Sequence, residues 1–286
     1  MTRGCTVGEV RVGPGRPLAV IAGPCVLESP DLALEVGSAM RDACARAGLT
    51  YIFKASFDKA NRTSPDSPRG PGLDRGLRWL ADARQALGAP VTTDVHEPAQ
   101  ADAVAREIDL LQIPAFLCRQ TDLLLASGRA AAAHGRAVNI KKGQFLSPAE
   151  MIGPVRKVLG AGCDRVMVTE RGTFFGYHRL VNDFVGLGDL LELDPGGGAC
   201  PVCFDCTHST QHPGAGVTSG GRPERAGLLA RAAVAAGVHA VFLECHPDPA
   251  RAASDAATML PLQDAVGLVE ELARLARVLP QTPART

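Results

Sequence analysis

One unit recurs eight times along the chain, and this repetition constrains the fold more than any other feature. In each copy an apolar run of five to eight residues ends in polar residues, and a helical pattern of apolar positions follows. Apolar strands that alternate with helices are typical of a parallel sheet covered by helices. The runs lie at 18–25, 50–57, 89–96, 110–116, 137–142, 165–172, 201–208 and 240–247. We therefore expect an α/β protein in which residues 1–286 form a single (β/α)8 TIM barrel domain, a fold of roughly 250 residues.

A doubly wound open sheet is the alternative for the same alternation of strands and helices. It usually has fewer units and an early glycine-rich phosphate loop, and no GxGxxG word follows the first apolar run here. The barrel is therefore favoured. The short N-terminal segment GEVRVGPGRP is expected to form a hairpin-like extension that covers the bottom of the barrel.

N-cap, proline and glycine residues predict where the helices begin and end. Ser29-Pro30 and Ser147-Pro148 have the form of an N-cap followed by proline, which predicts helix starts. Gly48, Gly88 and Gly237 stand where helices should stop. The longest stretches between elements, 58–72 and 209–221, are rich in Pro, Gly, Ser and charge, as functional loops often are.

Charge and composition exclude several classes of partner. The formal net charge is zero, so nothing global points to nucleic acid or to an acidic membrane surface. No apolar run has the length of a signal-peptide core or of a membrane span. The nine cysteines are an odd number scattered through apolar segments, which favours free thiols in a reducing cytoplasm over a disulfide framework.

Polar residues collect at the ends of the predicted strands, where parallel barrels place their chemistry. Alternation along a strand puts Lys54 with Ser56, Asn139 with Lys141, and Glu244 with His246 on shared faces. Asp94 and His96 either orient substrate or support neighbouring side chains, and we favour the supporting role. The whole set is Cys25, Lys54, Ser56, Asp94, His96, Gln112, Asn139, Lys141, Arg171, Asp205, His208 and Glu244.

Cations form the first theme among these strand ends. Any one of these cations could instead be a solvated residue on the rim of the barrel. Several like charges around one barrel mouth are costly unless an anion compensates them, and phosphate and carboxylate are the natural partners. The six cations are Lys54, Lys59, Arg62, Lys141, Lys142 and Arg171.

The second theme resembles a metal site. Cys25, His208 and Glu244 end three different strands, and Asp255 follows the last of them in a loop. A thiolate, an imidazole and two carboxylates suit Fe²⁺, Zn²⁺ or Mn²⁺ better than Ca²⁺ or Mg²⁺. From spacing alone the signal is weak, because a cysteine after Gly-Pro is more often a small packed residue.

A C-x-x-C-x-x-C word at Cys200, Cys203 and Cys206 suggests a zinc or iron–sulfur site as an alternative. Residues three apart in a strand face opposite sides of the sheet and cannot chelate one ion. We therefore interpret these thiols as core packing.

Nine words of the sequence, in order and over nearly the whole chain, resemble the 3-deoxy-D-manno-octulosonate 8-phosphate synthases. They are IAGPCVLES, FKASFDKANRTS, RGPGLDRGL, TTDVHEP, LQIPAFLCRQTDLL, NIKKGQF, TERGTFFGY, FDCTHSTQ and ECHPDP…SDAATMLPL. The resemblance implies a (β/α)8 barrel, usually a homotetramer. It implies condensation of phosphoenolpyruvate with D-arabinose 5-phosphate, on the route to lipopolysaccharide. Cysteine at position 25, where the metal-free branch has asparagine, implies the metal-requiring branch.

The same resemblance implies roles for individual residues. It makes Cys25, His208, Glu244 and Asp255 the metal ligands. It places Lys54, Asn61, His208 and Asp255 nearest the chemistry. The aldose side matches Asn61, Arg62 and Ser64, with Arg62 on the sugar phosphate. The phosphate and carboxylate of phosphoenolpyruvate match Lys54, Ser56, Lys59, Gln112, Ala115 through its backbone N–H, Lys141 and Arg171.

Three alternatives for the function stay open at this point. The sister 3-deoxy-D-arabino-heptulosonate 7-phosphate synthases use erythrose 4-phosphate and share the Gly-Pro-Cys word, but they carry Lys-Pro-Arg-Thr where this chain has Lys59-Ala60-Asn61-Arg62. A non-catalytic barrel that binds sugar phosphates is the second alternative. A Schiff base on Lys54 is the third, and its place among other cations favours a charge clamp instead.

Overall fold

Eight parallel strands close into a barrel. A computed structural model of the protein describes residues 2–60, 68–174, 178–213 and 220–279. Each barrel strand pairs with the next along the chain, and the last strand, β12, pairs with both β9 and β3, which closes the sheet. The strands are β3 (Ala19–Gly23), β4 (Thr50–Lys54), β5 (Val91–Asp94), β6 (Leu110–Ile113), β7 (Ala137–Lys141), β8 (Val166–Glu170), β9 (Val202–Asp205) and β12 (Ala240–His246). The predicted barrel is confirmed.

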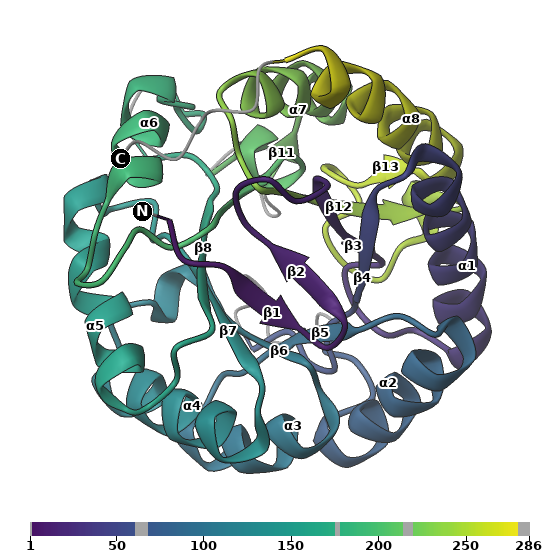
Figure 1. Ribbon diagram of the computed structural model, residues 1–286. Helices are drawn as coiled ribbons and strands as arrows, with labels where there is room; N and C mark the ends of the chain where they lie inside the picture. Colours follow the sequence, from purple (N-terminus) through teal and green to yellow (C-terminus); the bar gives the residue numbers. More distant parts are fainter. Residues whose placement is uncertain (1, 61–67, 175–177, 214–219, 280–286) are drawn as a thin grey trace.

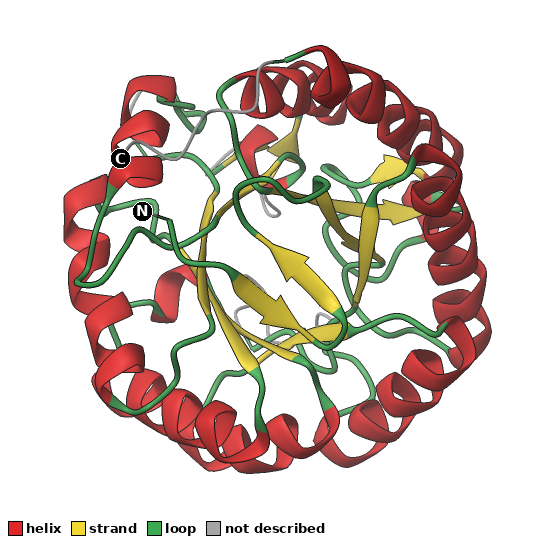
Figure 2. Ribbon diagram, viewed as in Figure 1, coloured by secondary structure: helices red, strands yellow, loops and turns green. Residues whose placement is uncertain are grey.

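A ring of α-helices surrounds the strands (Figure 1 and Figure 2). Short 3-10 turns precede α3, α5 and α7, so these helices begin a few residues later than their sequence patterns suggest. No helix of the described residues is long and apolar enough to cross a membrane. The helices are α1 (Pro30–Ala47), α2 (Leu73–Leu87), α3 (Ala101–Glu107), α4 (Thr121–His134), α5 (Ile152–Gly160), α6 (Phe184–Glu192), α7 (Ala226–Ala235) and α8 (Leu262–Val278).

The predicted helix boundaries are formed by the expected cap interactions. The Ser29 hydroxyl accepts the Leu32 N–H at the start of α1. Ser147 and Glu150 form a reciprocal capping box before α5. Gly48 and Gly88 follow α1 and α2 in the left-handed conformation, where a residue without Cβ has no steric penalty.

The N-terminal hairpin closes the bottom of the barrel. Strands β1 (Cys5–Val7) and β2 (Val10–Val12) pair antiparallel and lie across the centre of the helix ring (Figure 1). Their apolar side chains pack on the inward residues of the barrel strands, among them Ile21, Ile52 and Phe242. The bottom is thus sealed by apolar packing, and the polar strand ends lie at the opposite mouth.

Alternation along each strand divides the apolar residues into two layers. Inward residues form the core under the hairpin, and outward residues pack against the helices. Cys203 belongs to the inner layer, whereas Cys200 and Cys206 belong to the outer one. All nine cysteines are buried and free. The prediction that these three thiols are packed in the core is therefore confirmed.

Short additional strands lie at the mouth of the barrel. Strand β13 (Leu260–Pro261) pairs in parallel with the end of β12. Strands β10 (Gln211–His212) and β11 (Gly220–Gly221) form a small antiparallel pair in the segment that follows β9. These pairings hold the segments that carry His208 and Asp255 beside the strand ends.

Candidate active site at the carboxyl ends of the strands

The structure brings the four predicted metal ligands to one place. Cys25, Glu244 and Asp255 each offer a ligand atom within 4.8 Å of those of the other two. The Cys25 thiol donates to Asp255 Oδ2 at 3.0 Å. Nε2 of His208 lies 3.3 Å from Glu244 Oε2 and 4.0 Å from Asp255 Oδ2. Closure of the barrel by β12 brings Cys25 next to Glu244 and Asp255, which are more than two hundred positions away in the sequence.

Each of these ligands is supplied by a different local structure. Cys25 follows β3, and Glu244 is an inward residue of β12. The sequence predicted that His208 ends a strand, and this prediction is wrong. Strand β9 ends at Asp205, and His208 begins a 3-10 turn. Asp255 has a φ of 50°. This left-handed backbone is uncommon outside glycine, although aspartate tolerates it, and such conformations cluster at functional sites.

The electrostatics of the cluster fit a divalent cation. Oε2 of Glu244 is buried and has no hydrogen-bond partner among the described residues. A buried carboxylate oxygen without a partner is costly. When His208 is neutral with its proton on Nδ1, its Nε2 presents a lone pair to this oxygen, and a bound cation would satisfy both atoms. The mixed sulfur, nitrogen and oxygen donors suit Fe²⁺, Zn²⁺ or Mn²⁺.

The surroundings shift the pKa values of the ligands in opposite directions. Burial, with the carboxylates of Asp255 and Glu244, raises the pKa of the Cys25 thiol well above its usual range. Burial raises the pKa of Asp255, but the charge that His208 carries when it is protonated, the charge of Lys59 and the hydrogen bond from Cys25 together outweigh burial and lower that pKa. The same balance, led by His208 and Lys54, lowers the pKa of Glu244. Two ionised carboxylates therefore stand beside a protonated thiol.

The predicted cations do not form a bare positive ring, because the barrel supplies partners for most of them. Lys54 donates to the Cys25 carbonyl at 2.7 Å and pairs with Glu244. Lys59 donates to the Ser56 hydroxyl at 2.9 Å and lies 4.0 Å from Asp94 Oδ2. Lys141 pairs with Asp205 Oδ2 at 2.7 Å and lies over the Phe242 ring, 3.8 Å from its centroid.

Arg171 differs from these lysines. It is buried, its guanidinium donates to the Gln211 side chain at 2.6 Å, and it has no salt bridge to any described carboxylate. Burial lowers its pKa, although nearby carboxylates, Asp205 first among them, oppose that shift. A buried guanidinium without a carboxylate partner is the cation best prepared to take a phosphate or carboxylate from solution.

Lys142 does not belong to the predicted cationic cluster. It follows the inward residue Lys141, so its side chain leaves the other face of β7. There it is buried, donates to the Leu146 carbonyl at 3.0 Å and lies 3.4 Å from Glu170 Oε2. The interpretation of Lys142 as an anion-facing cation is therefore wrong, and its pair with Glu170 fixes the loop after β7.

A chain of hydrogen bonds links the remaining polar residues inside the barrel. Asp94 accepts from the Ser56 hydroxyl at 2.5 Å and from the Gln112 amide at 2.6 Å. Asn139 continues the chain by donating to Gln112 Oε1 at 3.1 Å and accepting from the Thr169 hydroxyl at 2.7 Å. Asp94 thus holds Ser56 and Gln112 in place, in agreement with the supporting role predicted for it.

His96 stands apart from that chain. Its ring contacts Phe57 edge-on, with 5.7 Å between centroids, and its Nδ1 has no hydrogen-bond partner among the described residues. Burial lowers its pKa. These contacts agree with a supporting residue at the end of β5.

Other predicted site residues have less informative surroundings. Ala115 lies at the start of a 3-10 turn directly after β6 and is buried. Asn61, Arg62 and Ser64, which the resemblance assigns to the aldose side, lie outside the described residues.

A model of the DAHP synthetase I family matches residues 4–279 of the sequence. The chain belongs to the DAHP synthetase I family. Several relatives are named 2-dehydro-3-deoxyphosphooctonate aldolase. The one from Nitrobacter winogradskyi is 53% identical over 268 residues, covering 93% of this chain and 91% of the relative. The one from Methylobacterium radiotolerans is 51% identical over 279 residues, covering 97% and 96%.

Two residues of this DAHP synthetase I family member carry contacts that the sequence did not reveal. Glu28 Oε1 accepts the Ala253 N–H at 3.1 Å and lies 3.6 Å from His246 Nε2. This ties the segment after Cys25 to the segment before Asp255. Asp205 was noted as a polar strand end, but its partners depend on the register of β9 against β7, which no sequence pattern states.

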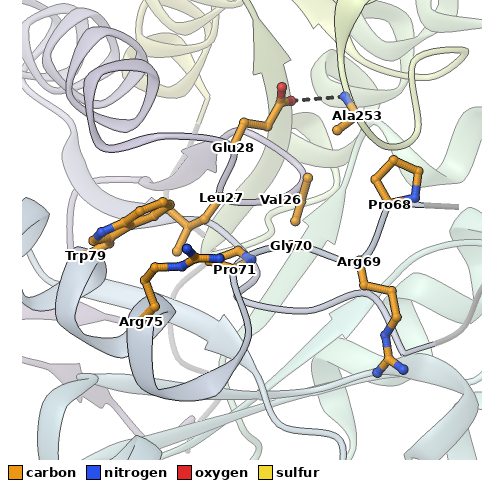
Figure 3. A pocket seen from close by; sticks show the side chains of 10 residues that line it. All are labelled: Val26, Leu27, Glu28, Pro68, Arg69, Gly70, Pro71, Arg75, Trp79 and Ala253. Carbon is orange, nitrogen blue, oxygen red and sulfur yellow. Dashed lines mark hydrogen bonds between the residues drawn. The ribbon is translucent and has the colours of Figure 1, made fainter.

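A cleft of about 520 Å³ flanks the segments that carry Cys25 and Asp255 (Figure 3). None of the four predicted metal ligands lines it. Arg75 lies over the Trp79 ring, 5.4 Å from its centroid, and the Glu28–Ala253 hydrogen bond spans its upper edge in the view of Figure 3. Its lining residues are Val26, Leu27, Glu28, Pro68, Arg69, Gly70, Pro71, Arg75, Trp79 and Ala253. In this family member the cleft therefore borders the candidate site without containing its chemistry.

Proposed function

We propose that this chain condenses phosphoenolpyruvate, D-arabinose 5-phosphate and water into 3-deoxy-D-manno-octulosonate 8-phosphate and inorganic phosphate, a step toward lipopolysaccharide. The observation that carries the proposal is the joint placement of the mixed donor set and the buried cations Lys54, Lys141 and Arg171 at one barrel mouth. The shared name of the relatives, 2-dehydro-3-deoxyphosphooctonate aldolase, supports this substrate pair over erythrose 4-phosphate.

The reaction joins two anions, so the site must first hold them close together. Carbon 3 of phosphoenolpyruvate forms a bond to the aldehyde carbon, and water adds to carbon 2. The bond between carbon 2 and the phosphate ester oxygen then breaks, so phosphate leaves and carbon 2 keeps the oxygen of water as its keto oxygen. We assign Arg171, Lys141 and Lys59 to the phosphate and carboxylate of phosphoenolpyruvate. Alignment of two reactants in this way can contribute about 7–11 kcal/mol in favourable cases.

The network around Asp94 orients polar groups beside the cations that we assign to phosphoenolpyruvate. Ser56 and Gln112 are held by the Asp94 carboxylate, so their free hydrogen-bonding capacity points in a fixed direction. Fixed polar groups stabilise developing charge without the reorganisation that water requires. Lys54, fixed against Cys25 and Glu244, joins these polar groups to the donor set.

We also propose that Cys25, His208, Glu244 and Asp255 hold a divalent metal ion, Fe²⁺, Zn²⁺ or Mn²⁺. Oε2 of Glu244, which has no hydrogen-bond partner in the described part of the chain, lies beside Nε2 of His208, and this supports the assignment. When bound, the ion would supply Lewis-acid chemistry to an oxygen of the aldehyde or of water. A ligand is a poor general base while it is bound, so His208 and Asp255 serve first as donors.

One assay tests the reaction and its metal requirement. The purified enzyme is offered phosphoenolpyruvate with either arabinose 5-phosphate or erythrose 4-phosphate, and phosphate release is measured before and after exhaustive chelation. We expect a preference for the five-carbon sugar, loss of turnover on chelation, recovery with added metal, and no metal-dependent turnover in Cys25→Ala. Preference for the four-carbon sugar would overturn the substrate assignment. Undiminished activity after chelation would overturn the metal alone.

We further propose a cytoplasmic homotetramer, as the resemblance implies. Nine free buried cysteines support a reducing compartment. Phe116, Phe145 and Phe174 are 48%, 42% and 43% exposed, and the rings of Phe116 and Phe174 contact each other at 6.4 Å between centroids. Exposed apolar groups of this kind support an interface. Light scattering on the purified protein measures the mass, and a monomer would contradict the proposal.

A further inference from the structure

The carboxylate of Asp205 has no role in the reaction as described, yet it is the most heavily engaged acid of the site. It ends β9, faces the barrel interior and is fully buried. Oδ1 accepts from the backbone N–H of His208 at 2.9 Å and from the Thr207 hydroxyl at 3.2 Å. Oδ2 lies 2.7 Å from His208 Nδ1 and accepts from Lys141 Nζ at 2.7 Å. The carboxylate of Asp205 therefore contacts donors from two segments, residues 207–208 and the end of β7 at Lys141.

The contact with His208 fixes the tautomer of its ring. The Asp205 carboxylate also accepts from the Lys141 ammonium, the Thr207 hydroxyl and the His208 backbone N–H, and a carboxylate surrounded by donors is held in its ionised form. An ionised carboxylate only accepts, so the ring proton sits on Nδ1. In a neutral imidazole Nε2 then carries the lone pair, and Nε2 is the atom that faces Glu244 and Asp255.

We propose that Asp205 is a positioning residue that turns the Nε2 lone pair of His208 toward the metal-ligand cluster and holds Lys141 beside it. This inference rests on the metal site proposed above. Histidines that bind metals commonly donate their second ring N–H to a carboxylate, which fixes ring orientation and strengthens the ligand. Here the same oxygen also accepts from Lys141, one of the cations that we assign to phosphoenolpyruvate.

Replacing the carboxylate by an amide separates these contacts. Asp205→Asn has nearly the same shape but only one acceptor oxygen. If that oxygen faces Nδ1 and Lys141, the amide NH₂ opposes the backbone N–H of His208. If it faces the backbone N–H, the NH₂ donates to Nδ1, and the ring proton moves to Nε2, where it blocks the lone pair. Both arrangements weaken the donor set.

The test measures metal binding directly on the metal-free full-length enzyme. Co²⁺ is titrated in, and the charge-transfer absorption of its bond to the Cys25 thiolate reports occupancy. We expect Asp205→Asn to bind Co²⁺ 10- to 100-fold more weakly than wild type. Asp94→Asn is the matched control, because Asp94 is also a buried inward acid at a strand end but contacts no proposed ligand. Its Co²⁺ affinity should stay within threefold of wild type.

The outcomes separate the two proposals. Wild type that binds no Co²⁺ at this site would overturn the metal site and this inference with it. Wild type that binds Co²⁺, with a folded Asp205→Asn that binds it within threefold, would overturn the role of Asp205 alone. Circular dichroism establishes whether each variant is folded.

If Asp205→Asn does not fold, the wild-type protein still decides. Its Co²⁺ form should show one exchangeable, hyperfine-shifted ring N–H proton with a nuclear Overhauser effect to the β-protons of the same histidine. That signal identifies Nδ1–H and ligation through Nε2. Its absence, or ligation through Nδ1, would overturn the proposal.

Discussion

At the scale of single residues, Lys54 illustrates how a buried charge is assigned to a partner. Its side chain is 1% exposed and is held by the Cys25 carbonyl and the Glu244 carboxylate, which is also 1% exposed. A lysine that forms a Schiff base needs a neutral amine with a free lone pair. An ammonium engaged by a carbonyl and a carboxylate has none, so the geometry favours an electrostatic role.

This assignment predicts the result of chemical trapping. Incubation of the enzyme with phosphoenolpyruvate, arabinose 5-phosphate and borohydride should leave its mass unchanged, because no imine forms to be reduced. The measurement is intact-protein mass spectrometry, with a peptide map of the segment that contains Lys54. A substrate-sized adduct on Lys54 would contradict the prediction and revive covalent catalysis.

The same pair predicts the stability of Lys54→Met. Methionine keeps much of the volume but leaves the Glu244 carboxylate buried without its ammonium. Removal of one partner of a buried ion pair costs about 3–5 kcal/mol of folding free energy. Urea unfolding followed by circular dichroism measures the loss. A variant as stable as wild type would show that the pair contributes no net stability.

The residue scale also shows what the sequence could predict about the site. Alternation along a strand correctly placed Lys54, Asn139 and Lys141 inside the barrel, and the same rule would have turned Lys142 outward. What alternation does not contain is the register between strands. Asp205 meets Lys141 and Glu244 meets Lys54 because of how separate strands align across the barrel interior, so the acid partners of the cations were not predictable.

At the scale of elements, the junction of β3 and β4 requires a glycine for steric reasons. A Cβ on Gly23 would lie 2.0 Å from the backbone oxygen of Lys54 and 3.0 Å from its carbonyl carbon. Real Cβ atoms essentially never come so close to backbone, so one of the strands would have to move. Gly23 thus allows the two strands that present Cys25 and Lys54 to approach.

Gly23→Ala should therefore reduce both stability and turnover. Overpacking of this kind typically costs about 1–3 kcal/mol, and displacement of Lys54 should lower kcat by at least about tenfold. Gly267→Ala is the control, because a Cβ at this position of α8 would have no atom of a described residue within 4 Å. That substitution should leave turnover unchanged and raise stability by up to about 1 kcal/mol. Thermal unfolding and phosphate release measure both effects, and wild-type behaviour of Gly23→Ala would contradict the steric account.

The helices were easier to predict than the loops. Local cap chemistry at Ser29 and Ser147 and the stops at Gly48 and Gly88 depend on residues within one turn of each other, so the sequence states them directly. The backbone of Asp255 and the tie between Glu28 and Ala253 depend on contacts between distant segments. Local propensity contains no signal for such contacts.

At the scale of the whole molecule, closure of the barrel depends on the segment that enters β12. The backbone of His239 contacts both neighbouring strands: its N–H donates to the Val202 carbonyl at 2.8 Å, and its carbonyl accepts the Ala19 N–H at 3.1 Å. The ring adds a third contact, because Nδ1 accepts the Val202 N–H at 3.1 Å. One residue thus joins β9, β12 and β3 at the point where the sheet closes.

This closure predicts a pH-dependent stability. Burial lowers the pKa of His239 from 6.5 to about 4. Between these pH values the unfolded chain binds a proton that the folded chain does not, so stability falls as pH decreases. The contribution is complete above pH 6.5 and is lost progressively down to about pH 4. At 1.36 kcal/mol per pKa unit, the loss is about 3 kcal/mol at most.

His239→Asn isolates this effect, because the asparagine oxygen can replace Nδ1 as acceptor for Val202 but does not titrate. Urea unfolding at a series of pH values should give matching stabilities for the two proteins near pH 7.5, with wild type falling below the variant by about 2–3 kcal/mol near pH 4. His239→Leu, which removes the acceptor, should instead be less stable near pH 7.5 by about 1–3 kcal/mol. Parallel curves for wild type and His239→Asn would show that His239 does not couple barrel closure to pH.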